Sequence, residues 1–345
     1  MLTRILTTEP ADIAVAAALL RAGELVAFPT ETVYGLGGDA LSAEAVAAIF
    51  AAKGRPAEDP LIVHLADRSE LPRVVAEVPP LAERLGAALW PGPLTLILPR
   101  GPDVPLLVTS GRATVAVRVP DHPVARALIR AAERPLAAPS ANRFGHTSPT
   151  TAAHVLADLE GRIAAVIDGG PTPIGVESTV LDLTRPVPTL LRPGGVSLEQ
   201  LRDLLGDVVV GEHVASRGPM ASPGLLERHY APESLLWLVV GAAPAALAWL
   251  RTRATSELAA GKHVGLLLTD EDAVALADLN ADCERLGSNR SPERIAHRLY
   301  SALRSLDARR PDIILTRDLG EHGLARAVSD RLTRAAAGRI VRLIE

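Results

Sequence analysis

The sequence is poor in cysteine, lysine and aromatic residues, and each scarcity excludes a class of protein. Cys283 is the only cysteine among 345 residues, which excludes an internal disulfide and any metal site built from several cysteines. Phe, Trp and Tyr together make up 3% of the chain, too few to suggest a stacking surface for single-stranded RNA. No run reaches the roughly 18 apolar residues of a membrane-spanning helix. The N-terminus also lacks a signal-peptide pattern, so we expect a cytoplasmic protein without membrane attachment.

Several common catalytic motifs are missing as well. There is no G-x-x-x-x-G-K-[ST] phosphate-binding loop, no H-E-x-x-H zinc motif and no G-x-S-x-G nucleophile motif. The net charge of −4 argues against a general nucleic-acid binder, which would normally carry an excess of basic residues. These absences favour catalysis by substrate positioning and charge neutralisation.

The length predicts about two domains, at roughly 150 residues each. Residues 1–211 alternate short apolar runs with helical stretches and predict an α/β domain with a twisted, mixed sheet. Residues 212–234 show no periodicity and are interpreted as a linker. Residues 235–345 show a strand–helix–strand pattern that predicts a smaller, Rossmann-like α/β domain. This second domain has no G-x-G-x-x-G after its first strand, so no dinucleotide site is predicted there.

Residues 28–64 contain the most informative pattern of the chain. They include FPTETVYGLG at 28–37 and KGRPAEDPLIVH at 53–64. Most of these polar residues directly follow one predicted strand, Leu25–Phe28, or precede another, Leu61–Leu65. Proline and glycine fix the turns between them. Ligands of open α/β folds bind at such strand ends, although a polar loop without chemistry would explain either half alone.

Basic side chains recur at the ends of strands and in turns of the first domain. They are Lys53, Arg55, His64, Arg118 and Arg192. We expect no matching acidic residues beside them, so the group predicts a pocket for phosphates or carboxylates. Lys53 is one of only two lysines in an arginine-rich chain. For Arg118, which alternates with valines, the competing interpretation is the solvent face of a half-exposed strand.

Capping signals predict where three helices begin. Ser42 is the expected N-cap of a helix over Ala43–Lys53, which Gly54 would end. Ser148 with Pro149 predicts a second helix start, and a helix N-terminus there could also meet an anion. Ser197 and Gln200 predict a capping box for a helix over Leu198–Leu205.

Taken together, these motifs resemble the threonylcarbamoyl-AMP synthase family in its longer, two-domain form, with a YrdC-like catalytic domain. The resemblance covers nearly all of the first domain and the linker, and its motifs occur in the family's order. The matching segments are 28–37, 53–64, WPGPLT at 90–95, 114–120, 138–142, SPT at 148–150, 168–179, 191–194 and HYAP at 229–232. The second domain matches mainly by position and size.

The resemblance implies that L-threonine, bicarbonate and ATP, with Mg²⁺ as the cofactor that accompanies ATP, give threonylcarbamoyl-AMP and pyrophosphate for tRNA modification. It implies a threonine site formed by Thr32, His64, Arg118, the Ala138 backbone and Ser178. It implies a nucleotide site formed by Lys53, Arg55, Asp59, Thr114, Ser140, Ser148, Arg192 and Tyr230, with Lys53 and Arg55 as the catalytic cations. Downstream threonylcarbamoyl transferase proteins are the implied partners, and tRNA is implied only indirectly.

One residue departs from the family pattern, and two other functions remain open. Asp59 stands where similar proteins often carry asparagine, and an acid near phosphates would repel them. A carbamoyl-adenylate module of hydrogenase maturation shares the domain, but such proteins carry cysteine-rich zinc segments. A non-catalytic RNA-binding module is disfavoured by the acidic net charge.

Overall fold

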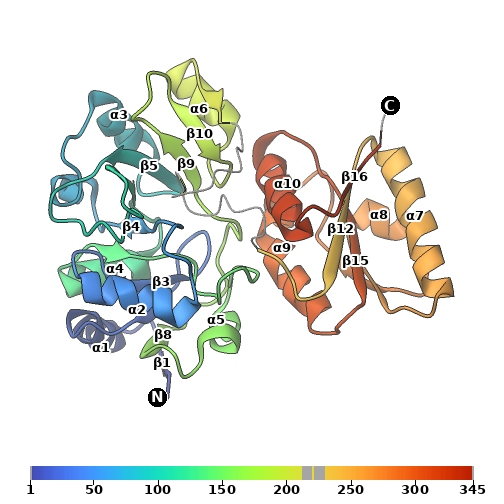
Figure 1. Cartoon of the computed structure of the whole chain (residues 1–345), viewed down its shortest axis with the longest axis horizontal. Coiled ribbons are helices and arrows are strands. Elements are labelled where there is room, and N and C mark those ends of the chain that lie inside the picture. The colour runs from blue at the N-terminus through green and yellow to red at the C-terminus, as the bar shows by residue number, and fades with distance from the viewer. Residues whose placement is uncertain (1, 212–219, 221–229, 344–345) are drawn as a thin grey trace. The chain divides into compact units, whose positions relative to one another are not determined.

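A computed structural model of the chain describes residues 2–211, 220 and 230–343. The chain divides into two compact units, residues 1–144 with 148–225, and residues 145–147 with 226–345 (Figure 1). The sequence did not predict that the short segment 145–147 groups with the second unit. Most of the predicted linker, residues 212–234, lies outside the described residues.

The first unit contains an eleven-stranded mixed sheet, which confirms the predicted α/β class. Its order is β1-β8-β2-β3-β7-β4-β6-β5-β9-β10-β11. The strands are β1 (Arg4–Leu6), β2 (Val26–Phe28), β3 (Gly35–Asp39), β4 (Ile62–His64), β5 (Leu94–Pro99), β6 (Thr114–Arg118), β7 (Leu136–Ala137), β8 (Ala165–Ile167), β9 (Thr179–Asp182), β10 (Thr189–Arg192) and β11 (Val209–Val210). The helices are α1 (Pro10–Arg21), α2 (Ala43–Lys53), the 3₁₀ helix η1 (Arg68–Arg73), α3 (Pro80–Leu89), α4 (Pro123–Ala132), α5 (Ala152–Leu159) and α6 (Leu198–Leu205).

Strand pairing brings distant motifs to one region of this sheet. β4 and β6 are parallel neighbours, and His64 pairs in register with Arg118 at their carboxyl ends. β9 is antiparallel to β10 and parallel to β5, so the segments around Ser178 and Arg192 meet. The core beneath is almost entirely aliphatic, as expected from the low aromatic content.

Strand β3 was missed by the sequence analysis because its sequence, GLGGD, contains three glycines. Glycine normally weakens a strand, but here the neighbouring side chains leave no room for larger residues. A Cβ placed on Gly37 would lie 2.7 Å from Cε1 of Phe28. Tight packing between β3 and its antiparallel neighbour β2 therefore requires glycine.

Two of the three predicted helix starts are confirmed. The Ser42 hydroxyl accepts from the Ala45 N–H, and Gly54 ends α2 with φ 63°. Ser197 and Gln200 form the capping box of α6. The third prediction was wrong: α5 begins at Ala152, and its N-cap is Thr151. Ser148 does not cap this helix because its hydroxyl bonds to a side chain elsewhere.

The second unit confirms the predicted smaller, Rossmann-like layer fold. Its five parallel strands are ordered β14-β13-β15-β12-β16. The helices α9 and α10 cover one face, and α7 and α8 cover the other (Figure 1). The elements are β12 (Leu235–Val240), α7 (Ala243–Ala259), β13 (Val264–Leu268), α8 (Asp270–Ala275), β14 (Asp282–Arg285), α9 (Pro292–Asp307), β15 (Ile313–Arg317), α10 (Gly323–Ala336) and β16 (Ile340–Arg342).

Candidate active site

Arg118 lies at the end of β6, and its guanidinium is held on three sides. Nη1 donates to the Thr32 hydroxyl at 2.9 Å, and Nε donates to the Gly92 carbonyl at 3.3 Å. Nη2 lies 2.5 Å from Oε1 of Glu31. Arg118 is 3% exposed, so the interpretation as a solvent-facing arginine was wrong. The planar guanidinium is therefore fixed in orientation, and a fixed guanidinium is a group suited to bidentate pairing with a carboxylate.

His64 lies beside Arg118 and is also buried. Burial and the charge of Arg118 lower the pKa of His64 to about 3, so the imidazole is neutral at neutral pH. Nδ1 lies 3.2 Å from the Ile62 carbonyl oxygen. A proton on Nδ1 satisfies that carbonyl and leaves Nε2 as a hydrogen-bond acceptor.

Arg192, at the end of β10, is bound to the segment that precedes β9. Its Nε and Nη2 donate to the Ser178 carbonyl at 3.1 and 3.0 Å, and Nη2 also donates to the Ser178 hydroxyl at 3.2 Å. That hydroxyl lies 2.8 Å from the Thr95 hydroxyl. Gly194 permits this approach, because a Cβ there would lie 2.3 Å from the Glu177 carbonyl oxygen.

Arg55 is paired with an acid, which corrects the expectation of cations without acidic neighbours. Its Nη2 lies 3.0 Å from Oδ2 of Asp59. Its Nε donates to the Asp59 carbonyl, and Nη2 donates to the Pro60 carbonyl. Glu31 plays the same part for Arg118. Buried charges are costly without a partner, so Arg55 and Arg118 are buried together with acids that were not predicted to pair with them.

Lys53 is directed at the backbone of the loop after β7. Its ammonium donates to the carbonyl oxygens of Ser140 and Asn142. Burial and the nearby charge of Arg55 hold the pKa of Lys53 well below its usual value. Lys53 therefore supports Ser140, which belongs to the predicted nucleotide site.

Ser148 donates to Oε1 of Glu177 at 2.6 Å, and both side chains are buried. Glu177 lies within the segment 168–179 that matches the family, but no role was predicted for it. Its only sequence signal was its position directly before Ser178. The pair explains why the Ser148 hydroxyl does not cap α5.

Three further predicted residues occupy separate surroundings. The Ala138 N–H donates to the Ile62 carbonyl next to His64. Thr114 begins β6, so it stands at the opposite end of that strand from Arg118. Tyr230 belongs to the second unit, where its ring packs on Tyr300 at 5.9 Å and under Arg331 at 5.2 Å. Its nucleotide contact stays a prediction.

Backbone hydrogen bonds join the turns that carry these side chains. In the turn after β2, the Glu31 carbonyl accepts from the Ile174 N–H and the Thr32 carbonyl accepts from the Gly175 N–H. The Tyr34 carbonyl accepts from the Ala141 N–H, and the Tyr34 N–H donates to the Pro149 carbonyl. The first unit therefore holds the predicted threonine and nucleotide segments in one connected framework.

No group of three His, Cys, Asp or Glu side chains that could hold a metal occurs in the described part of the chain. Mg²⁺ commonly binds through substrate phosphates and water with only one or two carboxylates. Among the described helices, none is long and apolar enough to cross a bilayer.

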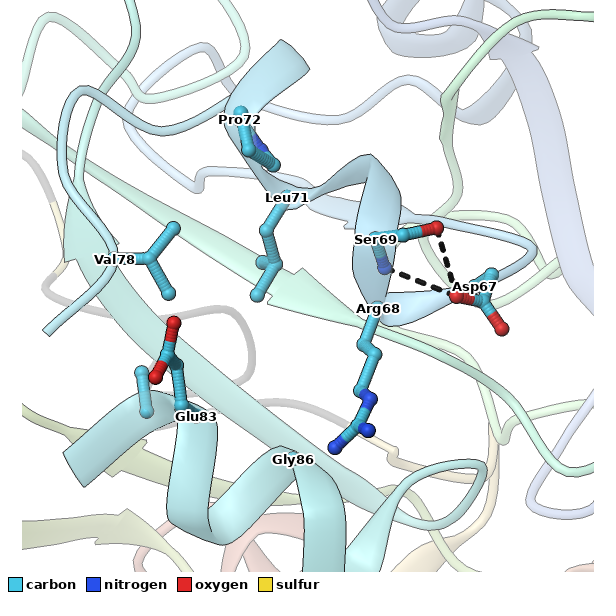
Figure 2. Close-up of a pocket in the computed structure, with 9 residues that line it drawn as sticks. Asp67, Arg68, Ser69, Leu71, Pro72, Val78, Glu83 and Gly86 are labelled. Atoms are coloured by element: carbon cyan, nitrogen blue, oxygen red, sulfur yellow. Dashed lines mark hydrogen bonds between the residues drawn. The ribbon is translucent and has the colours of Figure 1, made fainter. Parts of the chain in front are cut away.

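A surface pocket of about 600 Å³ lies between η1 and α3 (Figure 2). Leu71 and Val78 form part of its apolar wall, and Arg68 and Glu83 add charged groups. Asp67 beside it accepts from the N–H and hydroxyl of Ser69. None of the predicted site residues lines this pocket, so it is separate from the candidate active site.

Comparisons with known proteins agree with the geometry. A family model described as "Telomere recombination" matches residues 18–194, and one described as "Threonylcarbamoyl-AMP synthase, C-terminal domain" matches residues 196–337. The threonylcarbamoyl-AMP synthase of Bacillus subtilis (strain 168) is 46% identical, over 98% of this chain and 96% of that protein. The protein of that name from Pyrococcus abyssi (strain GE5 / Orsay) is 44% identical, over 96% of both chains.

A solved structure extends the similarity to three dimensions. The crystal structure of P. abyssi Sua5 complexed with L-threonine has a TM-score of 0.92 and 42% identity. The match covers 99% of this chain and 100% of that one. On sequence and fold over essentially its whole length, this chain belongs to the threonylcarbamoyl-AMP synthase family.

Proposed function

We propose that this chain is a nucleotidyltransferase that forms threonylcarbamoyl-AMP and pyrophosphate from L-threonine, bicarbonate and ATP. The observation that carries the proposal is the fixed, buried guanidinium of Arg118 beside Thr32 and His64. Arg55 and Arg192, buried in the same unit, supply further positive charge. Family membership supports the same activity.

The amino-acid end of the site is built around Arg118. Its guanidinium pairs with the α-carboxylate of threonine, and Thr32 fixes its orientation. His64, neutral with Nε2 free to accept, is suited to the threonine hydroxyl. Ser178 and the backbone at Ala138 complete the contacts.

The nucleotide end uses Lys53, Arg55 and Arg192, with hydroxyls from Thr114, Ser140 and Ser148. Arg55 and Lys53 neutralise charge on the leaving pyrophosphate. Mg²⁺ bound to the ATP phosphates would supply additional neutralisation. Asp59 moderates the charge of Arg55, and Tyr230 is a further nucleotide contact of this proposal.

The chemistry requires no covalent enzyme intermediate. The threonine amine combines with bicarbonate to give a carbamate and water. A carbamate oxygen then attacks the α-phosphorus in line, and pyrophosphate leaves from the opposite side. The protein contributes positioning and charge neutralisation.

The direct test is pyrophosphate release from ATP, with the adenylate product identified by mass spectrometry. Release should require both L-threonine and bicarbonate, and L-serine should be a poor substitute. Arg118→Lys keeps the charge but loses the bidentate geometry, so it should raise the KM for threonine about 10-fold or more. Release without threonine would favour the carbamoyl-adenylate alternative. RNA binding without release would favour the binding module.

The product's acylphosphate-type linkage to AMP makes it a group donor, so transferase proteins that act on tRNA are the natural consumers. A cytoplasmic location stays a prediction. For residues from 212 onward, we propose a role in retaining the nucleotide. Removing them should shorten nucleotide residence, and unchanged kinetics in the truncated chain would contradict that role.

A further inference from the structure

Glu31 is a buried carboxylate to which neither the family motif nor the proposed mechanism assigns a substrate contact. It lies in the turn between β2 and β3 and is 4% exposed. One oxygen, Oε1, forms the 2.5 Å ion pair with Arg118. Within the described residues, neither oxygen receives a hydrogen bond of normal geometry, and Oε2 has no charged partner of its own within the ion-pair distance. A buried carboxylate oxygen without a donor is costly, so Oε2 can accept a hydrogen bond from a donor that enters the site.

The position of Glu31 is fixed from both the backbone and the side chain. Its carbonyl accepts from the Ile174 N–H at 2.8 Å. The hydroxyl of the next residue, Thr32, accepts a hydrogen bond from the Arg118 guanidinium. The same hydroxyl lies 2.8 Å from the Thr30 hydroxyl. The carboxylate is therefore held beside the group that binds the substrate carboxylate.

The charges of the Glu31–Arg118 pair match those of a free α-amino acid. A zwitterion places its carboxylate against the guanidinium and its ammonium against the Glu31 carboxylate. This arrangement adds no net charge to a buried site, which limits the cost of desolvation. After carbamate formation, the nitrogen retains one N–H that the same oxygen can accept.

We propose that Glu31 binds the α-amino group of the substrate through Oε2, while its ion pair with Arg118 holds both recognition groups in place. This inference rests on the proposed function, since it takes threonine as the ligand. It makes Glu31 a specificity residue that selects ligands carrying both an amine and a carboxylate.

The test compares two ligands in two proteins by isothermal titration calorimetry with the full-length chain. The ligands are L-threonine and 2,3-dihydroxybutyrate of matching configuration, in which a hydroxyl replaces the α-amine. Wild type should prefer threonine by about 30-fold or more, because a charge-assisted bond exceeds a neutral one. Glu31→Gln, which keeps the shape but removes the charge, should reduce that preference to about 5-fold or less.

Glu31→Asp provides a second variant that keeps the charge but withdraws the carboxylate. It should weaken threonine binding more than binding of the dihydroxy acid. Equal weakening of both ligands by either variant overturns the inference, because a purely structural role would affect them alike. If wild type synthesises threonylcarbamoyl-AMP but Glu31→Gln keeps the wild-type preference for threonine over the dihydroxy acid, the inference about Glu31 is wrong and the proposed function stands. If wild type binds no threonine, both the inference about Glu31 and the proposed function are wrong.

Discussion

The Lys53 ammonium donates a hydrogen bond to the Asn142 carbonyl oxygen at 2.5 Å. It also donates to the carbonyl of Ser140, and the Lys53 carbonyl accepts from the Phe144 N–H. Both ends of the residue therefore hold the loop after β7. We therefore expect Lys53 to influence ATP binding by holding this loop in place, in addition to the charge neutralisation proposed above.

Lys53→Met should consequently affect stability and nucleotide binding together. It leaves two carbonyls without their donor, which should lower the free energy of unfolding by about 2 kcal/mol. The KM for ATP should rise about 10-fold through displacement of Ser140, with a smaller change for threonine. Denaturant unfolding and steady-state kinetics measure both effects.

The matched control is the other lysine, Lys262, which is half exposed and paired with Glu257. Lys262→Met should change stability by less than about 1 kcal/mol. The contrary outcome is a Lys53→Met protein of unchanged stability whose kcat falls about 10²-fold. It would show that Lys53 acts mainly through its charge at the reacting phosphates and not through the loop after β7.

Asp59→Asn tests whether the acid next to Arg55 helps or hinders ATP. Loss of the buried charge partner should cost about 1–3 kcal/mol of stability, because the amide still accepts a hydrogen bond. Removal of a negative charge near the phosphates should lower the KM for ATP about threefold or more. Weaker ATP binding at normal stability would show that Asp59 contacts the nucleotide or its Mg²⁺.

The sequence predicted local features of this fold better than contacts between distant segments. The helix over Ala43–Lys53 could be predicted because its cap, its stop and its apolar content all lie within a few residues. The pairing of His64 with Arg118 depends on strand order, which local periodicity does not encode. The Glu31–Arg118 ion pair depends on the same order, so the sequence suggested a cationic pocket without its acids.

His64 should make stability depend on pH in acid solution. Its folded pKa is about 3, against 6.5 when unperturbed, so between these values the unfolded state binds a proton that the native state excludes. The free energy of unfolding therefore loses nothing to His64 well above pH 6.5. Below that pH it falls by about 1.4 kcal/mol for each pH unit. From pH 6.5 to pH 5, the loss from His64 amounts to about 2 kcal/mol.

His64→Gln removes this titration and keeps a side chain of similar size that can form hydrogen bonds. The difference in unfolding free energy between wild type and His64→Gln should therefore shift by about 2 kcal/mol between pH 7 and pH 5. Urea unfolding at both pH values measures it. A difference that stays constant would mean that the pKa of His64 in the folded protein is close to its unperturbed value of 6.5.

Tyr230 combines a buried ring with a left-handed backbone, and the two features oppose each other energetically. Its ring packs on Tyr300 and under Arg331, whereas its φ of 60° is unfavourable for a bulky residue. Tyr230→Ala removes the ring but retains a Cβ, so amide exchange in the second unit should report a loss of about 3 kcal/mol. Tyr230→Gly removes the same ring and relieves the backbone, so it should be more stable than the alanine variant by about 1 kcal/mol. Leu235→Ala, at an exposed position of β12, is the surface control. If alanine proves as stable as glycine, the left-handed conformation of residue 230 is not maintained in solution.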